Sequence, residues 1–186
     1  MLFWILMTFG FDKPYIAVLT FCAAMLHELG HILASVLTKV GTGGINGKLN
    51  GLRIKIPHTA NYPKSLLIIL AGPLTNVLVA LPLLLIGDND YIRMFGLINL
   101  LTALSNLLPV EGYDGYRLLC ELGSSAGIFK INTVMKRLSF SLIIAITLLS
   151  LYLLLRLGVG YWLFAVFFTS MISKSAEAEN SRKGRI

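Results

Sequence analysis

The sequence predicts an all-α membrane protein, a polytopic bundle of about six transmembrane segments with a short β-like surface loop. Of its 186 residues, 56% are hydrophobic and only 13% are charged, and the mean hydropathy is +0.77, far above that of a soluble domain. The apolar residues are gathered into long runs separated by short polar connectors. Basic residues fall mostly on alternate connectors, which is typical of a membrane topology.

The first two apolar runs differ in length. Residues 2–9 are too few to span a hydrocarbon core of about 30 Å, so they predict a half-helix or the remnant of a first segment. This run lacks a basic n-region and a small-residue cleavage site, so no cleavable signal peptide is expected. Residues 15–37 are long enough to span and contain two of the three histidines.

The connector over residues 39–64 is rich in glycine and contains two Asn-Gly turn signals. Leu52, Ile54 and Ile56 alternate with basic residues, which is the period of a β-strand. We expect a short hairpin or a single strand at the membrane surface, and an ordinary polar connector is the alternative.

The remaining runs complete the predicted bundle. Residues 65–86 form the third run, interrupted by Gly72-Pro73, and residues 91–108 form the fourth, which stops at Pro109. A helix is expected to resume over 116–122, followed by a polar connector over 123–136. The last two runs, 138–155 and 159–172, contain no candidate ligand.

We therefore expect one membrane domain over residues 1–173, with the chemistry confined to about 15–122. The basic tail, 174–186, has a composition that predicts disorder. Cys22 and Cys120 both lie in apolar helices, where a thiol behaves as a small hydrophobe, so no disulfide is expected.

The basic residues also predict an orientation. Only Lys13, Arg93 and Arg156 lie on connectors of one side, and the other 13 of the 16 basic residues lie on the opposite side or in the tail. The positive-inside rule then places both termini and the glycine-rich loop in the cytoplasm. Because this topology accounts for the net charge of +7, no nucleic-acid partner is expected.

The second run carries the motif H-E-x-x-H, from His27 to His31. On a helix, histidines four residues apart project from one face and can bind one zinc ion. Glu28 follows the first ligand, where its carboxylate can act as a base on a water at the metal. A charged side chain at mid-bilayer costs roughly 2.5–3.5 kcal/mol on insertion scales, so three ionisable residues in an apolar run need a functional reason. A metal site is therefore favoured over the alternative that the two histidines only form hydrogen bonds within the bundle.

Asp114 is the favoured third ligand. His31, Gly72 and Asp114 each lie about eight residues from the cytoplasmic end of their segment, or roughly 12 Å at the rise of an α-helix. This shared depth predicts one site in the cytosolic half of the membrane. Glu111 is the competing candidate, nearer the rim, and His58 is expected to be solvated in the loop.

Three motifs occur in order: H-E-L-G-H, then Ala-Gly-Pro-Leu-Thr-Asn over 71–76, then Asn-Leu-Leu-Pro over 106–109 followed by Asp114-Gly115. Together they resemble the site-2 protease family of intramembrane zinc metalloproteases. Within this family the chain resembles the compact bacterial type, which includes the sporulation protease that processes a pro-sigma factor. The resemblance covers about residues 15–122.

The resemblance implies that Asp114 is the third ligand of a single Zn²⁺ and that Glu28 is the catalytic base. It also implies a substrate that spans or associates with a membrane, such as a pro-sigma or anti-sigma factor, and a location in the bacterial cell membrane. The chain departs from the family at its periphery. The opening helix is short and no PDZ or CBS domain is attached, so a regulatory membrane protein is expected to control access.

Asn76 could donate to the oxyanion or fix the substrate backbone, and an inter-helix hydrogen bond is an equal alternative. Leu52, Ile54 and Ile56 could hold an unwound substrate as an added strand. The remaining motif residues are expected to support the structure: Gly72 and Pro73 at a kink and close helix contact, and Asn106, Pro109 and Gly115 around the helix break.

Two other functions use similar residues. A zinc transporter also places histidine and aspartate in membrane helices, but it does not need a carboxylate beside the first histidine. It also requires a polar path, whereas the outer halves of these runs are almost purely apolar. An inactive metal-binding scaffold is the third interpretation.

Overall fold

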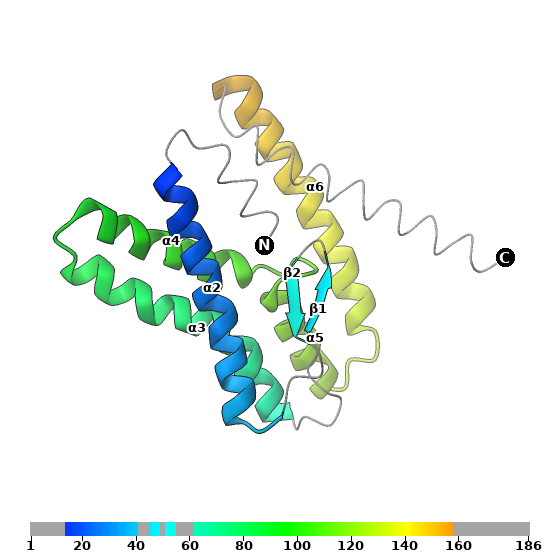
Figure 1. Ribbon diagram of the computed structural model, residues 1–186. Coiled ribbons are helices and arrows are strands. Elements are labelled where there is room, and N and C mark those ends of the chain that lie inside the picture. The colour runs from blue at the N-terminus through cyan, green and yellow to red at the C-terminus, as the bar shows by residue number, and fades with distance from the viewer. Residues whose placement is uncertain (1–13, 41–44, 49–50, 55–61, 158–186) are drawn as a thin grey trace. The chain divides into compact units, whose positions relative to one another are not determined.

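The computed structural model describes residues 14–40, 45–48, 51–54 and 62–157 (Figure 1). The chain divides into two compact units, Met1–Met135 and Lys136–Ile186. The first unit contains the helices α2 to α5 and the strands β1 and β2, and the second contains most of α6.

Three described helices are long and apolar enough to cross a membrane. They are α2 (Pro14–Leu37), α3 (Tyr62–Ile86) and α6 (Ile131–Leu157), with spans over Tyr15–Leu37, Tyr62–Ile86 and Ile131–Arg156. The protein is therefore an integral membrane protein with a helical fold. The first and last predicted runs lie outside the described residues, so the count of six segments stays a prediction.

Helix α2 has clear signals at both ends. Pro14 is its first residue, where the missing N–H and fixed φ suit a helix start. At the other end Lys39 has a positive φ of 55°, a left-handed conformation that commonly terminates helices. The Thr38 hydroxyl donates to the Ala34 carbonyl at 2.7 Å and so satisfies one of the last backbone acceptors.

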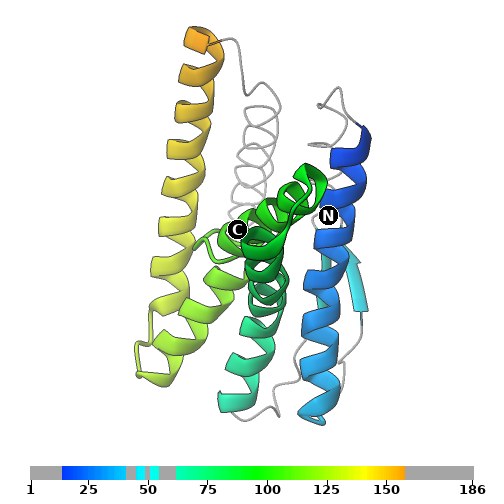
Figure 2. The same cartoon turned by 90° about the vertical axis from the view of Figure 1, so that its left-hand side faces the viewer.

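Helix α3 is continuous, which corrects the predicted interruption at Gly72-Pro73. Both Pro73 and Pro82 lie inside it. Each proline removes one backbone hydrogen bond, but such losses are tolerated in membrane helices where neighbouring groups compensate. Because α3 packs against α2, α4 and α5, its backbone is held from several sides, and Figure 2 shows it between α2 and α5.

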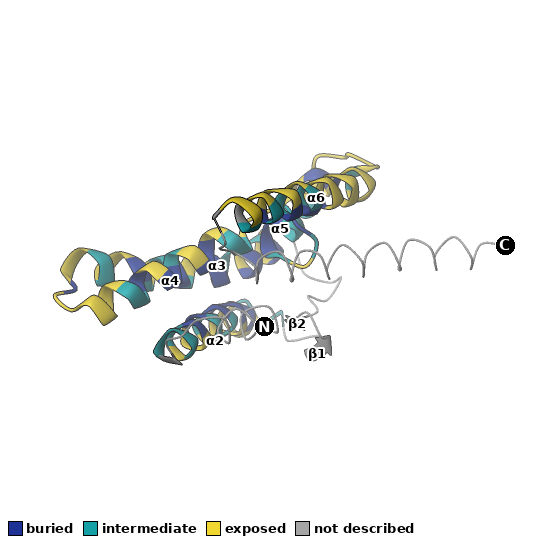
Figure 3. Ribbon diagram, turned by 90° about the horizontal axis from the view of Figure 1, so that it is seen from above, coloured by how far each residue is buried: buried dark blue, intermediate teal, exposed yellow. Residues whose placement is uncertain are grey.

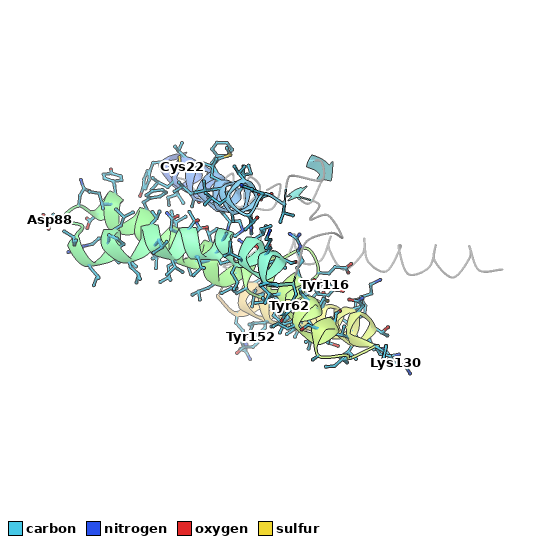
Figure 4. All side chains as sticks on the ribbon, turned by 90° about the horizontal axis from the view of Figure 1, so that it is seen from below. Cys22, Tyr62, Asp88, Tyr116, Lys130 and Tyr152 are labelled. Atoms are coloured by element: carbon cyan, nitrogen blue, oxygen red, sulfur yellow. The ribbon has the colours of Figure 1, made fainter. Side chains whose placement is uncertain are left out.

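Helix α4 (Asp90–Asn106) returns antiparallel to α3 after a tight turn. The Asn89 side chain caps α4 by accepting from Tyr91 N at 2.9 Å, and Arg93 Nε donates to Gly87 O at 2.8 Å across the turn. Asp88 marks this turn at one end of the helix pair in Figure 4. The rings of Tyr15 and Tyr91 meet edge to face with centroids 5.2 Å apart, which fixes the start of α2 beside the start of α4.

The fourth predicted run breaks as expected and resumes as α5 (Asp114–Ser125), slightly longer than the predicted 116–122. The polar connector predicted over 123–136 is wrong, because α5 extends to Ser125 and α6 begins at Ile131. The short link contains Gly127, whose positive φ of 76° favours glycine.

The glycine-rich connector forms a two-stranded antiparallel hairpin, β1 (Ile45–Lys48) and β2 (Gly51–Ile54). Its register pairs Ile45 with Ile54 and Lys48 with Gly51. Ile56 lies outside the described residues, so the proposed strand is described only as far as Ile54.

Figure 3 shows that the helices of the first unit have exposed residues on their outer faces and buried residues where they meet. Many of the exposed residues are large and apolar, whereas several of the buried ones are polar. Leu78 is 70% exposed and Leu85 82% exposed, whereas Asn76 and Asn99 are fully buried. Cys22 also lies on an exposed part of α2 (Figure 4). Exposed leucines around buried amides are unfavourable in water but suit a lipid environment.

Candidate metal centre

Three side chains from two helices converge at one buried point. Helix α2 provides His27 and His31, and Asp114 is the first residue of α5. The Asp114 Oδ2 atom lies 3.0 Å from His27 Nε2 and 3.1 Å from His31 Nε2, and the two Nε2 atoms are 3.2 Å apart. Among the described residues these three form a group that could hold a metal ion, and we call them the candidate metal centre.

The other ring nitrogen of each histidine fixes the tautomer. His31 Nδ1 lies 2.7 Å from the Ile68 carbonyl oxygen, which can only accept, so Nδ1 carries the proton. His27 Nδ1 lies 2.9 Å from Asn76 Oδ1 and donates to it in the same way. In these neutral tautomers both Nε2 atoms present lone pairs to the site.

Three lone pairs therefore meet at distances of 3.0–3.2 Å, an arrangement that is favourable only with a proton or a metal cation among them. Tetrahedral zinc, with bonds of about 2.0–2.1 Å, places neighbouring ligand atoms about 3.3 Å apart. The triangle matches one face of such a tetrahedron and leaves a fourth position for water. Two imidazoles and a carboxylate are also a donor set that catalytic zinc uses.

A break in the chain positions Asp114. Tyr113 precedes it in an extended conformation, with φ −97° and ψ 161°, and the carboxylate then lies in the first turn of α5, where the helix dipole favours an anion. A Cβ at Gly115 would overlap the Leu107 carbonyl, so only glycine permits this approach to the end of α4. Arg117 Nη1 lies 3.7 Å from Asp114 Oδ1, the oxygen that does not face the histidines.

Gly72 lies against the edges of the two imidazoles, next to the Nε2 atom of His31 that faces the site. A Cβ at this position would overlap His31 Nε2 and would lie 2.8 Å from His27 Cε1. Glycine is therefore required where α3 passes the histidine pair. The close contact expected near Gly72-Pro73 is a contact with the two rings.

Glu28 lies beside His27 on α2 and is partly buried. The motif thus places a partly buried carboxylate directly after the first histidine of the candidate metal centre. Of the two acidic candidates for the third ligand, Asp114 and not Glu111 joins the histidine pair. His58 lies outside the described residues, and nothing is described of the Leu52 and Ile54 side chains.

Two asparagines of the motifs make contacts inside the bundle. Asn76 Nδ2 donates to Ala23 O at 3.0 Å and to Asn99 Oδ1 at 2.9 Å. These are the inter-helix hydrogen bonds expected as one of the two roles of Asn76, and they use both hydrogens of its amide. Asn106 Nδ2 donates to Thr102 O at 2.9 Å, within the last turn of α4 just before Pro109. Pro109 itself follows α4 in the irregular segment that leads to α5.

Sequence reasoning missed Asn99 and the Ile68 carbonyl. The sequence does indicate Asn99, because an amide in the middle of an apolar run is unfavourable unless it has hydrogen-bond partners. The Ile68 carbonyl has none, since every residue has a backbone carbonyl and only the packing of α2 on α3 selects this one.

The fold and the site define an integral membrane protein of packed helices with a buried His-His-Asp group suited to zinc. No protein-family model matches the chain. A curated protein of Synechocystis sp. named "Putative zinc metalloprotease sll0528" is 25% identical over 181 residues, which cover 89% of this chain. The chain spans about half of that relative's length, 47%.

The site-2 protease from Methanocaldococcus jannaschii has the same fold. The two structures match with a TM-score of 0.64 and 22% identity, over 90% of this chain and 84% of the other. At this level of identity, the structural match shows a shared fold.

Proposed function

We propose that this chain is an intramembrane zinc metalloprotease that hydrolyses a peptide bond in or near the membrane segment of a membrane-associated protein. The observation that carries the proposal is the buried triangle of two imidazole nitrogens and one carboxylate oxygen, with Glu28 next to the first histidine. A relative named as a zinc metalloprotease and the site-2 protease fold support the same activity.

In this proposal His27, His31 and Asp114 hold one Zn²⁺. When bound, zinc supplies a Lewis acid that polarises the scissile carbonyl and makes water acidic enough to attack near neutral pH. Other residues of the chain hold the three zinc ligands in place. The Asn76 and Ile68 oxygens orient the two imidazoles, and Arg117 lies beside the Asp114 oxygen that does not face the histidines.

Glu28 acts as the general base and acid. Its carboxylate takes a proton from the attacking water and delivers it to the nitrogen of the leaving amine, so that one side chain serves both steps. Burial of this carboxylate among helices that exclude water strengthens its interaction with the charges that develop in the reaction.

The substrate must present an extended segment, because a transmembrane helix hides its carbonyls in its own hydrogen bonds. We propose that the strand with Leu52, Ile54 and Ile56 adds to such a segment as a neighbouring strand, with Ile54 at the end of β2. A pro-sigma or anti-sigma factor in a bacterial cell membrane fits this requirement, with both termini of the protease in the cytoplasm and a regulatory membrane protein controlling access.

A zinc carrier and an inactive scaffold are the competing functions. Both need the three ligands, but neither needs a carboxylate beside the first histidine. The partly buried Glu28 directly after His27 therefore favours a hydrolase.

The test is co-expression with candidate membrane-anchored sigma-factor precursors and anti-sigma factors, with fragments detected by immunoblotting. We expect Glu28→Gln to retain zinc and to abolish cleavage, because an amide cannot accept the proton. Glu121→Gln, the same change at the far end of α5, serves as the control and should cleave normally. Zinc transport that survives Glu28→Gln would favour the carrier, and unchanged cleavage would contradict the role of Glu28.

A further inference from the structure

A chain of amide hydrogen bonds joins the candidate metal centre to α4, a helix that provides none of its three residues. Asn76 on α3 contacts His27 with its oxygen and donates from Nδ2 to Asn99 Oδ1 at 2.9 Å. Asn99 in turn donates from its own Nδ2 to the Phe95 carbonyl at 2.9 Å. Both asparagines are fully buried, so neither amide is solvated by bulk water.

The direction of this chain is fixed at its α4 end. The Phe95 carbonyl can only accept, so the Asn99 amide nitrogen faces it and the Asn99 oxygen faces Asn76. Asn76 must then direct its nitrogen toward Asn99 and Ala23, and its oxygen toward His27. The orientation of the Asn99 amide on α4 thus determines that of Asn76, and Asn76 in turn contacts the His27 imidazole on α2.

We propose that Asn99 is a positioning residue for the metal site and acts on His27 through Asn76. With Asn99 in place, the Asn76 oxygen holds the proton on His27 Nδ1 and leaves the Nε2 lone pair directed at Asp114. The proposal rests on the proposed zinc centre and does not depend on which peptide the protein cleaves.

Loss of the Asn99 oxygen leaves one Asn76 amide hydrogen unsatisfied in an apolar interior, which is unfavourable. The other Asn76 amide hydrogen still donates to the Ala23 carbonyl. The Asn76 amide can rotate to relieve the unsatisfied group, and that rotation moves its oxygen away from His27 Nδ1. The imidazole then loses the contact that fixes its tautomer and ring orientation.

The experiment measures zinc affinity of the detergent-purified full chain by competition with a chromophoric chelator. A lost supporting contact of a metal-bound histidine typically costs roughly 10- to 100-fold in affinity, which is the loss we expect for Asn76→Leu. For Asn99→Leu, one step further away, we expect a loss of about threefold to tenfold and an altered visible spectrum of the cobalt-substituted protein.

Thr102→Val is the matched control. Thr102 is buried on the same helix, but its hydroxyl donates to Ile98 O within α4 and does not join the amide chain. This variant should bind zinc as the wild-type protein does, and the melting temperature of each metal-free variant shows whether it is folded. If Asn99→Leu does not fold, Asn99→Ala removes the same oxygen without adding a branched side chain.

The double variant Asn76→Leu/Asn99→Leu decides whether the two asparagines act in series. We expect no loss beyond that of Asn76→Leu, because Asn99 has nothing to orient once Asn76 is gone. An Asn99 effect of equal size in both backgrounds, or wild-type affinity in Asn99→Leu, would overturn this proposal alone. A wild-type protein that binds no zinc would overturn the metal centre as well.

Discussion

The two sides of the candidate metal centre are built in different ways. His27 and His31 come from one unbroken helix, where a spacing of four residues places both rings on one face. Asp114 is instead the first residue of a helix that begins after an irregular segment, and its approach depends on a glycine against the Leu107 carbonyl. The histidine pair is thus local in sequence, whereas the carboxylate reaches it only through tertiary structure.

This difference separates what each side needs in order to work. The histidine side needs a small neighbour on α3 and two acceptors for its Nδ1 protons. The aspartate side needs the correct backbone path between α4 and α5. Changes on the first side should therefore act mainly on metal affinity, and changes on the second should act on folding as well.

The largest effect is expected for Asp114→Ala. This variant removes one of three ligands while the histidine pair remains, so zinc affinity should fall by more than the roughly 10- to 100-fold cost of a lost supporting contact. Chelator competition measures the loss. Glu111→Ala removes the carboxylate that does not join the group, and an equal loss there would reverse the assignment of the third ligand.

Gly115→Ala should be next in size and should destabilise the protein. The new methyl group overlaps backbone atoms of Leu107, which cannot move without shifting the end of α4. Overpacking of this kind costs typically about 1–3 kcal/mol and occasionally more. Thermal unfolding of the metal-free protein measures it, with Ser124→Ala at an exposed position of the same helix as control. Wild-type stability would show that the break is more adaptable than the geometry implies.

Gly72→Ala should weaken zinc binding more than it lowers stability. Here the methyl group meets the edges of two imidazole rings, which can rotate away and so relieve the overlap at the expense of ligand geometry. We expect a loss of affinity of about 10-fold or more, as for other changes that misorient a ligand. If Gly72→Ala lowers the melting temperature as much as Gly115→Ala, the two sides do not differ in the proposed way.

Arg117→Gln should have the smallest effect. Its guanidinium lies 3.7 Å from Asp114 Oδ1 and its side chain is 32% exposed, and ion pairs of this kind contribute about 0–1 kcal/mol. Zinc affinity should therefore change by less than about fivefold. A change as large as that of Gly72→Ala would mean that Arg117 sets the orientation of the carboxylate.

The same contrast explains what could be predicted from the sequence. The histidine pair, the helix break and the participation of Asp114 follow from helical spacing, a proline and shared membrane depth. The hairpin follows from the Asn50-Gly51 turn signal and the alternating residues, whereas the other turn signal, Asn46-Gly47, is wrong because it lies inside β1. These features depend on residues close together in the chain or on the distance from a membrane surface.

The errors arise where tertiary packing decides. Gly72-Pro73 reads as an interruption, but helices on several sides hold α3 through both prolines. The composition of residues 123–136 predicts a connector between helices, but most of these residues belong to α5 and α6. Asn99 and the Ile68 carbonyl become visible as partners only when α2, α3 and α4 are packed together.

The most direct test of the central claim is the zinc X-ray absorption spectrum of the purified, stoichiometrically loaded protein. We expect first-shell nitrogen and oxygen ligands at about 2.0–2.1 Å with the scattering of two imidazoles, and of one imidazole in His27→Ala. A wild-type spectrum without two imidazoles, or one unchanged in His27→Ala, would show that zinc is not held by this pair of histidines.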